Sequence, residues 1–403
     1  MSTSTEDECI SANGLPRVGI VCDLLQENWP SMDLVADMLF KNLHERHSPS
    51  FGVQQLRPPW ESRRTQSGAA LNGSVPLGKR LFNRILRYPL WLSGRKGDFD
   101  LFHVIDHSYA HLVHRLPPER TVVTCHDVDA FRGLVEPAHT LRQRVWRSVT
   151  RRILSGLQSA AWIICDSGAT ADELVANGWA RPERMSVIHL GVSPVFSPSP
   201  DPQADDEADQ LLNAHTGIKL LHVGSNIPRK RFDVLLRAFR EVKKALPDVA
   251  LVRVGGPLGP GLQSLAEELG VDHAIVVLPF VSDRVLAAVY RKCNLLVLPA
   301  EREGFGLPVL EAMACGLPVV ASDIPALREV GGDAVVYAEA GNVEALVSAV
   351  LRLIRAQPVE MEQRQRNGLV QAGKFSWSKC ADETAKIYEK VLSAAPVKVS
   401  DRR

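Results

Sequence analysis

The chain has 403 residues, of which 45% are hydrophobic and 23% are charged, and its formal net charge is +1. This length is enough for two domains with substantial cores, and the near-zero charge gives no field that argues for nucleic acid or acidic partners. No apolar run approaches the roughly 20 residues that span a bilayer, and the acidic N-terminus lacks the basic start and apolar core of a signal peptide.

The first part of the chain reads as an α/β domain. Residues 17–23 predict a buried first strand and residues 31–46 predict a helix, whereas residues 48–78, rich in Ser, Gly, Pro and Arg, predict an irregular insertion. Strands alternating with helices favour a parallel sheet. Further buried strands are expected at 100–106, 121–127 and 161–167.

A Pro- and acid-rich stretch, residues 194–210, interrupts this pattern and is the best candidate for a linker. A second α/β series follows, so we expect two doubly wound, Rossmann-like domains whose ligands bind at the carboxyl ends of the strands. Its strands are expected at 218–223, 249–254, 274–278, 295–298 and 318–321.

The expected organisation therefore has five parts. They are a disordered leader at 1–16, an N-terminal domain at 17–197, a linker at 198–215, a C-terminal domain at 216–375 and a last helix at 376–395.

The seven cysteines are scattered, odd in number and without a Cys-x-x-Cys pair. Cys22, Cys125 and Cys165 lie in apolar runs. This pattern predicts reduced core residues of a cytoplasmic protein.

Residues 301–322 carry the strongest functional signal. Glu303 and Glu311 stand eight positions apart, separated by the glycine-containing loop 304–306 that leads into a helix predicted from Pro308 to Gly316. The amides at such a helix start attract phosphate, so Glu303 is expected at the mouth of an anion site. Glu303 suits contact with a sugar, and Glu311, one turn into the helix, suits the two hydroxyls of a ribose.

This segment resembles the E-x7-E signature of retaining glycosyltransferases with the GT-B fold, family 4, and Gly-Phe-Gly-Leu-Pro, Glu-Ala-Met-Ala and Gly-x-Pro-Val-Val-Ala-Ser also match that family. The alternative is a buried βαβ turn with solvated acids. The resemblance implies two domains facing a central cleft, a nucleotide diphosphate sugar as co-substrate, and no cofactor or metal. It also implies that the last helix crosses back to the N-terminal domain.

A basic turn follows the predicted strand at 218–223 and resembles the family's phosphate loop. Lys230 aligns best with the family's diphosphate-binding lysine, and Arg229 is a second cation. Relatives often carry a basic residue nearer the glycine, where this chain has Ser225 and Asn226, so the charge is expected from Arg229 or Arg231. The alternative is a solvated basic turn.

His126 ends a predicted strand and resembles the family's catalytic histidine. The histidines at 103, 107, 111 and 114 have no matched carboxylates or cysteines for a metal, and we interpret the pairs Asp98/Asp100 and Asp127/Asp129 as coincidental.

Three other features bear on recognition. The resemblance implies that the segment 278–281 reads the nucleobase, while Gly255 is either a point of close nucleotide approach or a strand-end turn. After the first strand, where relatives often have Gly-Gly, Trp29 is a candidate stacking face for an acceptor. The predicted catalytic positions are His126, Glu303 and Lys230, and the predicted donor-binding positions are Ser225, Asn226, Arg229, Lys230, Gly255, Phe280, Val281, Glu303, Gly304, Phe305, Gly306, Leu307 and Glu311.

The resemblance implies retaining transfer of a mannose- or glucose-type hexose to a hydroxyl of a glycan or lipid-linked acceptor. Basic residues interleaved with apolar ones at 79–96 and 142–152 fit either an anionic membrane surface or an ordinary solvated helix face. The other hypotheses are a nucleotide-sugar epimerase or phosphorylase of the same fold, and a non-catalytic nucleotide-sugar-binding subunit.

Overall fold

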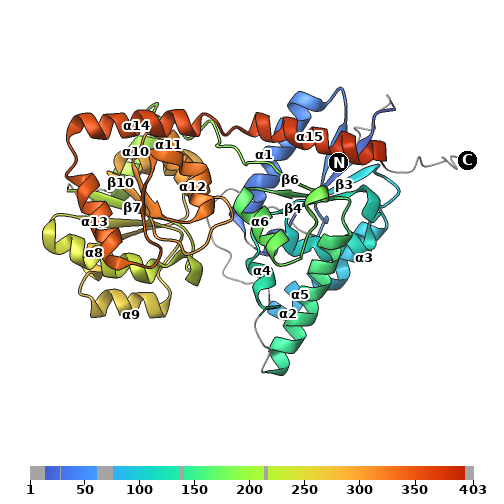
Figure 1. Cartoon of the computed structure of the whole chain (residues 1–403), viewed down its shortest axis with the longest axis horizontal. Helices are drawn as coiled ribbons and strands as arrows, with labels where there is room; N and C mark the ends of the chain where they lie inside the picture. The colour runs from blue at the N-terminus through green and yellow to red at the C-terminus, as the bar shows by residue number, and fades with distance from the viewer. Residues whose placement is uncertain (1–13, 28, 61–75, 136–139, 213–216, 395–403) are drawn as a thin grey trace, which may run out of the picture. The chain divides into compact units, whose positions relative to one another are not determined.

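The computed structural model describes residues 14–27, 29–60, 76–135, 140–212 and 217–394 (Figure 1). Most of the predicted leader, residues 61–75 of the predicted insertion and the end of the predicted linker lie outside these described residues. The chain divides into two compact units. Unit 1 comprises Met1–Asp166, Thr170–His189 and Trp377–Arg403, and unit 2 comprises Ser167–Ala169 and Leu190–Ser376.

Unit 1 contains a six-stranded parallel sheet in the order β2-β1-β3-β4-β5-β6. Its central strands are buried on both faces, as their apolar sequences predict. The strands are β1 (Arg17–Val21), β2 (Gly52–Leu56), β3 (Leu101–Val104), β4 (Thr121–Cys125), β5 (Trp162–Cys165) and β6 (Met185–Val187).

The strand β2 corrects the expectation of an irregular insertion at 48–78. Its sequence Gly-Val-Gln-Gln-Leu is only half-buried, because it forms the edge of the sheet and needs no continuous apolar run. Because it contains two polar glutamines, this strand was not predicted by a search for buried, apolar strands.

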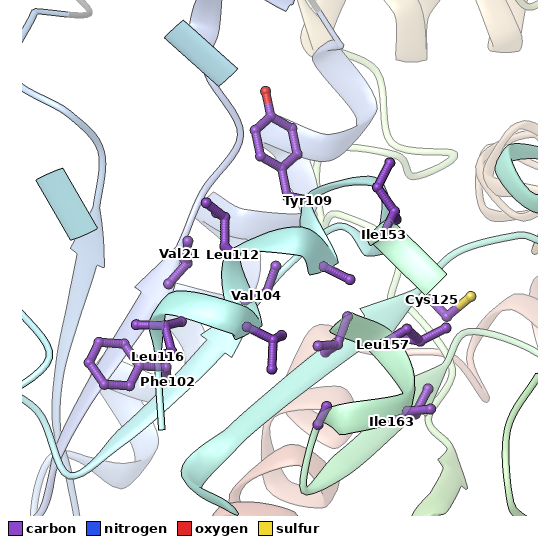
Figure 2. Close-up of a cluster of buried hydrophobic side chains, with 14 of the residues drawn as sticks. Val21, Phe102, Val104, Tyr109, Leu112, Leu116, Cys125, Ile153, Leu157 and Ile163 are labelled. Atoms are coloured by element: carbon purple, nitrogen blue, oxygen red, sulfur yellow. The ribbon is translucent and has the colours of Figure 1, made fainter. Parts of the chain in front are cut away.

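The core of unit 1 lies between the sheet and the segments η3 (His107–Arg115) and α5 (Leu141–Ser159), as Figure 2 shows. On the sheet side it contains Val21, Phe102 and Val104, and on the helix side Leu112 and Leu157. The remaining helical segments of unit 1 are η1 (Leu25–Glu27), α1 (Pro30–His47), α2 (Leu77–Phe82), η2 (Asn83–Arg87), α3 (Tyr88–Ser93), η4 (Pro118–Arg120), α4 (Asp129–Arg132), α6 (Gly168–Ala176), η5 (Pro182–Arg184) and α15 (Trp377–Ala394).

The C-terminal helix α15 belongs to unit 1, where it packs along α1 (Figure 1). The Tyr388 hydroxyl lies 2.7 Å from His103 Nδ1, and His103 Nε2 lies 2.7 Å from Thr124 Oγ1. At the surface, Asp382 accepts hydrogen bonds from Arg46 and pairs with His47. A buried polar chain therefore joins α15 to β3 and β4.

Unit 2 contains a second six-stranded parallel sheet, in the order β12-β11-β10-β7-β8-β9. The change of direction between β10 and β7 is the topological switch point at which open α/β sheets bind ligands. The strands are β7 (Lys219–Val223), β8 (Ala250–Val254), β9 (Ile275–Leu278), β10 (Leu295–Leu298), β11 (Val319–Ser322) and β12 (Val336–Ala338).

Helices pack on this sheet, and α8 and α13 lie together over one apolar core that includes Phe239, Leu251 and Leu346 (Figure 1). The acidic segment expected to be a linker contains α7, which packs on α10 within unit 2, where Arg291 pairs with Asp205. The helical segments of unit 2 are α7 (Pro202–Leu212), η6 (Pro228–Lys230), α8 (Phe232–Ala245), α9 (Pro260–Glu268), η7 (Asp272–Ala274), α10 (Asp283–Lys292), α11 (Leu307–Ala314), α12 (Pro325–Gly331), η8 (Gly332–Ala334), α13 (Val343–Ile354) and α14 (Pro358–Ala372).

The cysteines at 22, 125, 165, 293, 315 and 380 are buried and free of disulfides. Among the described residues, no helix is long and apolar enough to cross a membrane.

Candidate active site

Two loops meet at the switch point of the sheet in unit 2. One follows β7 and contains Arg229 and Lys230, and the other follows β10 and contains Glu303. Because β7 and β10 are neighbouring parallel strands, their carboxyl ends bring these loops together. A backbone hydrogen bond from the Glu301 amide to the Arg229 carbonyl, 2.8 Å long, joins them directly.

The Glu303 carboxylate accepts from both cations of the first loop. Lys230 Nζ lies 2.5 Å from Oε1, and Arg229 Nη1 lies 3.3 Å from Oε2. Only 5% of the Glu303 side chain is exposed, against 13% for Lys230 and 14% for Arg229. Two cations facing one carboxylate leave one net positive charge at the mouth of this site, which suits an anionic ligand.

The helix α11 begins directly after this carboxylate. Gly306 caps it in the left-handed conformation, with a φ of 106° that other residues rarely adopt, and Gly304, Phe305 and Gly306 are buried. Leu307, the first residue of the helix, is half-buried. The loop and helix start expected from the sequence are therefore present.

Glu311 lies inside α11 and is buried. Burial raises the pKa of Glu311 to about 8, against the lowering effect of a 2.8 Å hydrogen bond that the Tyr290 hydroxyl donates to its Oε2. At neutral pH this carboxyl group therefore holds a proton.

The predicted donor-binding residues of unit 2 lie at one end of the sheet, after β7, β8, β9 and β10. Asn226, although exposed, already has two partners, since its Oδ1 accepts from Arg253 and its Nδ2 donates to the Pro257 carbonyl. Phe280 is 71% exposed after β9, and Val281 and Ser225 are half-buried.

Gly255 serves the packing of two loops. Its φ is 136°, and a Cβ there would lie 1.9 Å from the Gly224 carbonyl oxygen, so the loops after β7 and β8 can only touch if this residue is glycine. This geometry accounts for the glycine by its contact with Gly224.

Arg231 differs in role from its two basic neighbours. It adopts the left-handed conformation at φ 49° and pairs with Asp233 and Glu301. Its charge is therefore compensated within the protein, and Arg229 and Lys230 are the cations of the loop that face Glu303.

His126 lies at the end of β4 in unit 1 and is buried. Its Nδ1 is 2.5 Å from Asp166 Oδ2, and its Nε2 is 2.8 Å from the Ile105 carbonyl oxygen. Burial by itself would lower the pKa of His126, but the charge and hydrogen bond of Asp166 outweigh it and raise the pKa to about 10. Both ring nitrogens therefore donate, and the ring is a fixed imidazolium.

Sequence reasoning missed several aspartates that, like His126, lie just after the end of a strand in unit 1. Asp166 comes directly after β5, and Asp23 and Asp106 come two residues after β1 and β3. Burial and the nearby Asp106 raise the pKa of Asp23 well above its usual value. A polar residue immediately after each apolar run was the available signal.

The four histidines weighed as metal ligands have other contacts, among them His107, whose Nδ1 accepts from the His126 backbone amide at 3.4 Å. His111 Nε2 bonds to the Arg84 carbonyl and His114 Nε2 to the Arg152 carbonyl, while His103 lies in the chain to Tyr388. Within the described part of the chain, no group of three or more His, Cys, Asp or Glu side chains could hold a metal ion.

Solved structures of other proteins share this fold. Sucrose-phosphate synthase from Thermosynechococcus elongatus matches with a TM-score of 0.73 and 19% identity, covering 94% of this chain and 100% of that one. Anabaena Alr3699/HepE in complex with UDP and glucose matches with a TM-score of 0.68 and 18% identity, covering 93% and 100%. The fold is thus GT-B, with two Rossmann-like domains, as the sequence predicted.

Sequence comparison adds the family. The model for "Glycosyltransferase Family 4" matches residues 35–196, and that for "Glycosyl transferases group 1" matches residues 203–370. The O-antigen chain mannosyltransferase B of Escherichia coli is 31% identical over 283 residues, which is 69% of this chain and 72% of the relative. The chain belongs to this glycosyltransferase family.

A second group of relatives carries a different name. The D-inositol 3-phosphate glycosyltransferase of Mycolicibacterium smegmatis is 29% identical over 313 residues, 75% of this chain and 66% of the relative. The match spans about half the length of other proteins of that name, such as 53% in Gordonia bronchialis.

Proposed function

We propose that this glycosyltransferase transfers a mannose- or glucose-type hexose, with retention of configuration, from a nucleotide diphosphate sugar to a hydroxyl of a glycan or lipid-linked acceptor. The observation that carries the proposal is the buried Glu303 carboxylate held by Lys230 and Arg229 at the switch point of the unit 2 sheet. The name of the E. coli relative supports mannose as a donor sugar and polysaccharide assembly as the setting.

The chemistry follows from these charges. As the bond between sugar and diphosphate breaks, negative charge grows on the leaving oxygen and positive charge grows on the anomeric carbon. Lys230 and Arg229 stabilise the departing diphosphate, and Glu303 holds sugar hydroxyls. The departing phosphate oxygen then takes the proton of the acceptor hydroxyl, which attacks from the same face.

In this scheme His126 is held in one position and does not transfer a proton. With Asp166 on one nitrogen and the Ile105 carbonyl on the other, the ring is an electrostatic element and has no free nitrogen to act as a base. The positive ring and its carboxylate partner set the local field at the end of β4.

The test is product formation from UDP-, GDP- and ADP-linked hexoses, with Glu303→Ala beside the parent protein. Glu241→Ala, on the exposed face of α8, is the matched control. We expect one donor to be hydrolysed slowly or transferred, with activity lost in Glu303→Ala and kept in the control. Equal activity in all three proteins would contradict the role of Glu303, and conversion of the donor to an epimer would establish the epimerase alternative.

Retention is tested separately. The anomeric configuration of the sugar in the first product, followed by ¹H NMR, is expected to match the donor. An inverted product would contradict the retaining assignment without affecting the assignment of the donor site.

A lipid-linked acceptor is supported by the surface of unit 1. Phe82, Leu86 and Leu90 recur every four residues along the continuous segment α2–η2–α3 and are 55%, 53% and 64% exposed. On α5, Val145 and Trp146 are 58% and 46% exposed beside the exposed Arg144. Apolar side chains among exposed arginines and lysines suit an anionic lipid bilayer.

Co-sedimentation with vesicles tests this contact. We expect binding to vesicles containing phosphatidylglycerol and loss of binding in Leu86→Asp/Leu90→Asp, whereas Val370→Asp, at a 69% exposed position of α14 in unit 2, keeps it. Equal sedimentation of all three proteins would contradict it.

A further inference from the structure

A buried arginine lies beneath the Lys230 loop without a negative partner. Arg253 is the one charged residue of β8, whose sequence is Ala-Leu-Val-Arg-Val, and its exposed fraction is 0%. Among the residues that the structure describes, no carboxylate lies within ion-pair distance of its guanidinium. Burial lowers the pKa of Arg253 only to about 10, so the group stays charged at neutral pH.

The guanidinium connects the loops that follow β7 and β8. Its Nη2 donates to Asn226 Oδ1 at 2.5 Å, and its Nε donates to the Gly256 carbonyl at 3.3 Å. Asn226 in turn donates to the Pro257 carbonyl at 2.8 Å. The third nitrogen, Nη1, is buried and has no hydrogen-bond partner.

The groups around Arg253 do not neutralise it. Its Cζ lies 4.4 Å from the centre of the Phe232 ring, which also packs edge-on against His222, the residue opposite Arg253 in the β7–β8 register. Burial lowers the pKa of His222 well below its usual value, with Arg253 and Lys230 adding to the effect, so this imidazole is neutral.

An unpaired buried charge destabilises a protein unless an opposite charge compensates it. Asn226, on the loop that also contains Lys230, accepts a hydrogen bond from Arg253, so the buried charge lies directly against this loop. We infer that Arg253 is a positioning residue for the diphosphate: it fixes the loop through Asn226 and supplies, from below, a positive charge that the bound diphosphate compensates. This inference rests on the proposed function.

The first test removes the charge and keeps the volume. Arg253→Met, Arg253→Lys and the exposed-surface control Arg237→Met would be compared for binding of UDP, GDP and ADP and of the corresponding nucleosides by calorimetry or NMR titration. We expect Arg253→Met to lower the affinity for the nucleoside diphosphate by at least about tenfold and to leave the affinity for the nucleoside unchanged. Arg253→Lys should restore part of the loss, and the control should bind as the parent does.

The second test gives the buried cation a partner and does not depend on the folding of Arg253→Met. In Asn226→Asp a carboxylate replaces the amide oxygen that accepts from Arg253. We expect the midpoint of thermal unfolding to rise, because the cation is now paired, and the affinity for the diphosphate to fall. Asn226→Ala, which removes the contact without adding charge, should lower both.

Equal weakening of diphosphate and nucleoside by Arg253→Met, or a lower unfolding midpoint in Asn226→Asp, would overturn the inference. Failure of the parent protein to bind any of the three diphosphates would instead contradict the proposed function. The stability comparison of the Asn226 variants would still report on the unpaired charge in that case.

Discussion

The Tyr290 hydroxyl donates a buried hydrogen bond to Glu311 Oε2, so the second glutamate of the E-x7-E motif is joined to helix α10. Burial nevertheless dominates and raises the pKa of Glu311 to about 8. The motif therefore combines one glutamate that is paired with two cations and a second that is protonated.

This difference predicts a pH dependence of stability. The folded protein keeps a proton on Glu311 up to about pH 8, whereas the unfolded chain loses it near its ordinary pKa of 4.5. Stability is therefore lost as the pH rises between these values, by about 1.4 kcal/mol per pH unit at most. In Glu311→Gln this loss should disappear, so the variant gains stability relative to the parent from pH 5 to about pH 8.

Urea unfolding at several pH values measures this difference, with Glu268→Gln on the exposed surface of α9 as the control. Parallel pH profiles for the parent and Glu311→Gln would show that Glu311 ionises normally in the folded protein.

His126 and Asp166 predict a loss of stability in the same direction, but at higher pH. The raised pKa of His126, about 10, means that its contribution to stability is complete below about pH 6.5 and is lost as the pH rises toward 10. NMR titration of the ring should show an imidazolium at pH 8 in the parent protein. Asp166→Asn should bring the pKa of His126 down by several units, since burial alone lowers it, and a ring that titrates near 6.5 in both proteins would contradict the pairing.

The buried chain from Tyr388 to Thr124 predicts that one hydroxyl on the last helix stabilises unit 1. Tyr388→Phe leaves His103 Nδ1 buried without a partner, which should cost about 1–3 kcal/mol of unfolding free energy. Burial lowers the pKa of His103 to about 3, so the cost should be the same from pH 5 to pH 8. Ser393→Ala, at an exposed position of α15, should leave stability unchanged, and an equally small effect in Tyr388→Phe would contradict the prediction.

The left-handed backbone at position 231 predicts that glycine is more stabilising there than alanine. This conformation strains any residue with a Cβ, so Arg231→Gly should be more stable than Arg231→Ala by about 1 kcal/mol, both variants having lost the pairs with Asp233 and Glu301. At Arg240, in the middle of α8, the order should reverse, with Ala favoured by about 1 kcal/mol. Thermal or urea unfolding of the four variants measures both differences, and the same order at both positions would contradict the strain.

Of the twelve strands in the described part of the chain, nine were predicted, because they are continuous apolar runs. β10 was predicted at its observed bounds, Leu295–Leu298, and Gly316 lies just beyond the end of α11 in the left-handed conformation, as its residue type suggests. The edge strand β2 was missed, because a half-exposed strand with two glutamines carries no such run, and the three-residue edge strands β6 and β12 were missed as well.

Contacts between residues that are distant in the sequence could not be predicted from local sequence patterns. The contact between Lys230 and Glu303 joins residues 73 positions apart, and it depends on β10 lying beside β7, which no motif states. Asp166 is 40 positions from His126. The role of Arg253 was missed for another reason: it is a single charged residue within a strand that is otherwise apolar.

The central claim is that the Lys230 loop of unit 2 holds a nucleotide diphosphate, and equilibrium binding of UDP, GDP and ADP tests it most directly. The parent protein should bind at least one of the three, and Lys230→Ala should lower the affinity for that nucleotide by about tenfold or more. The control Lys244→Ala, an exposed lysine of α8, should bind as the parent does. Equal affinity in the parent and Lys230→Ala, or no binding by the parent, would contradict the account.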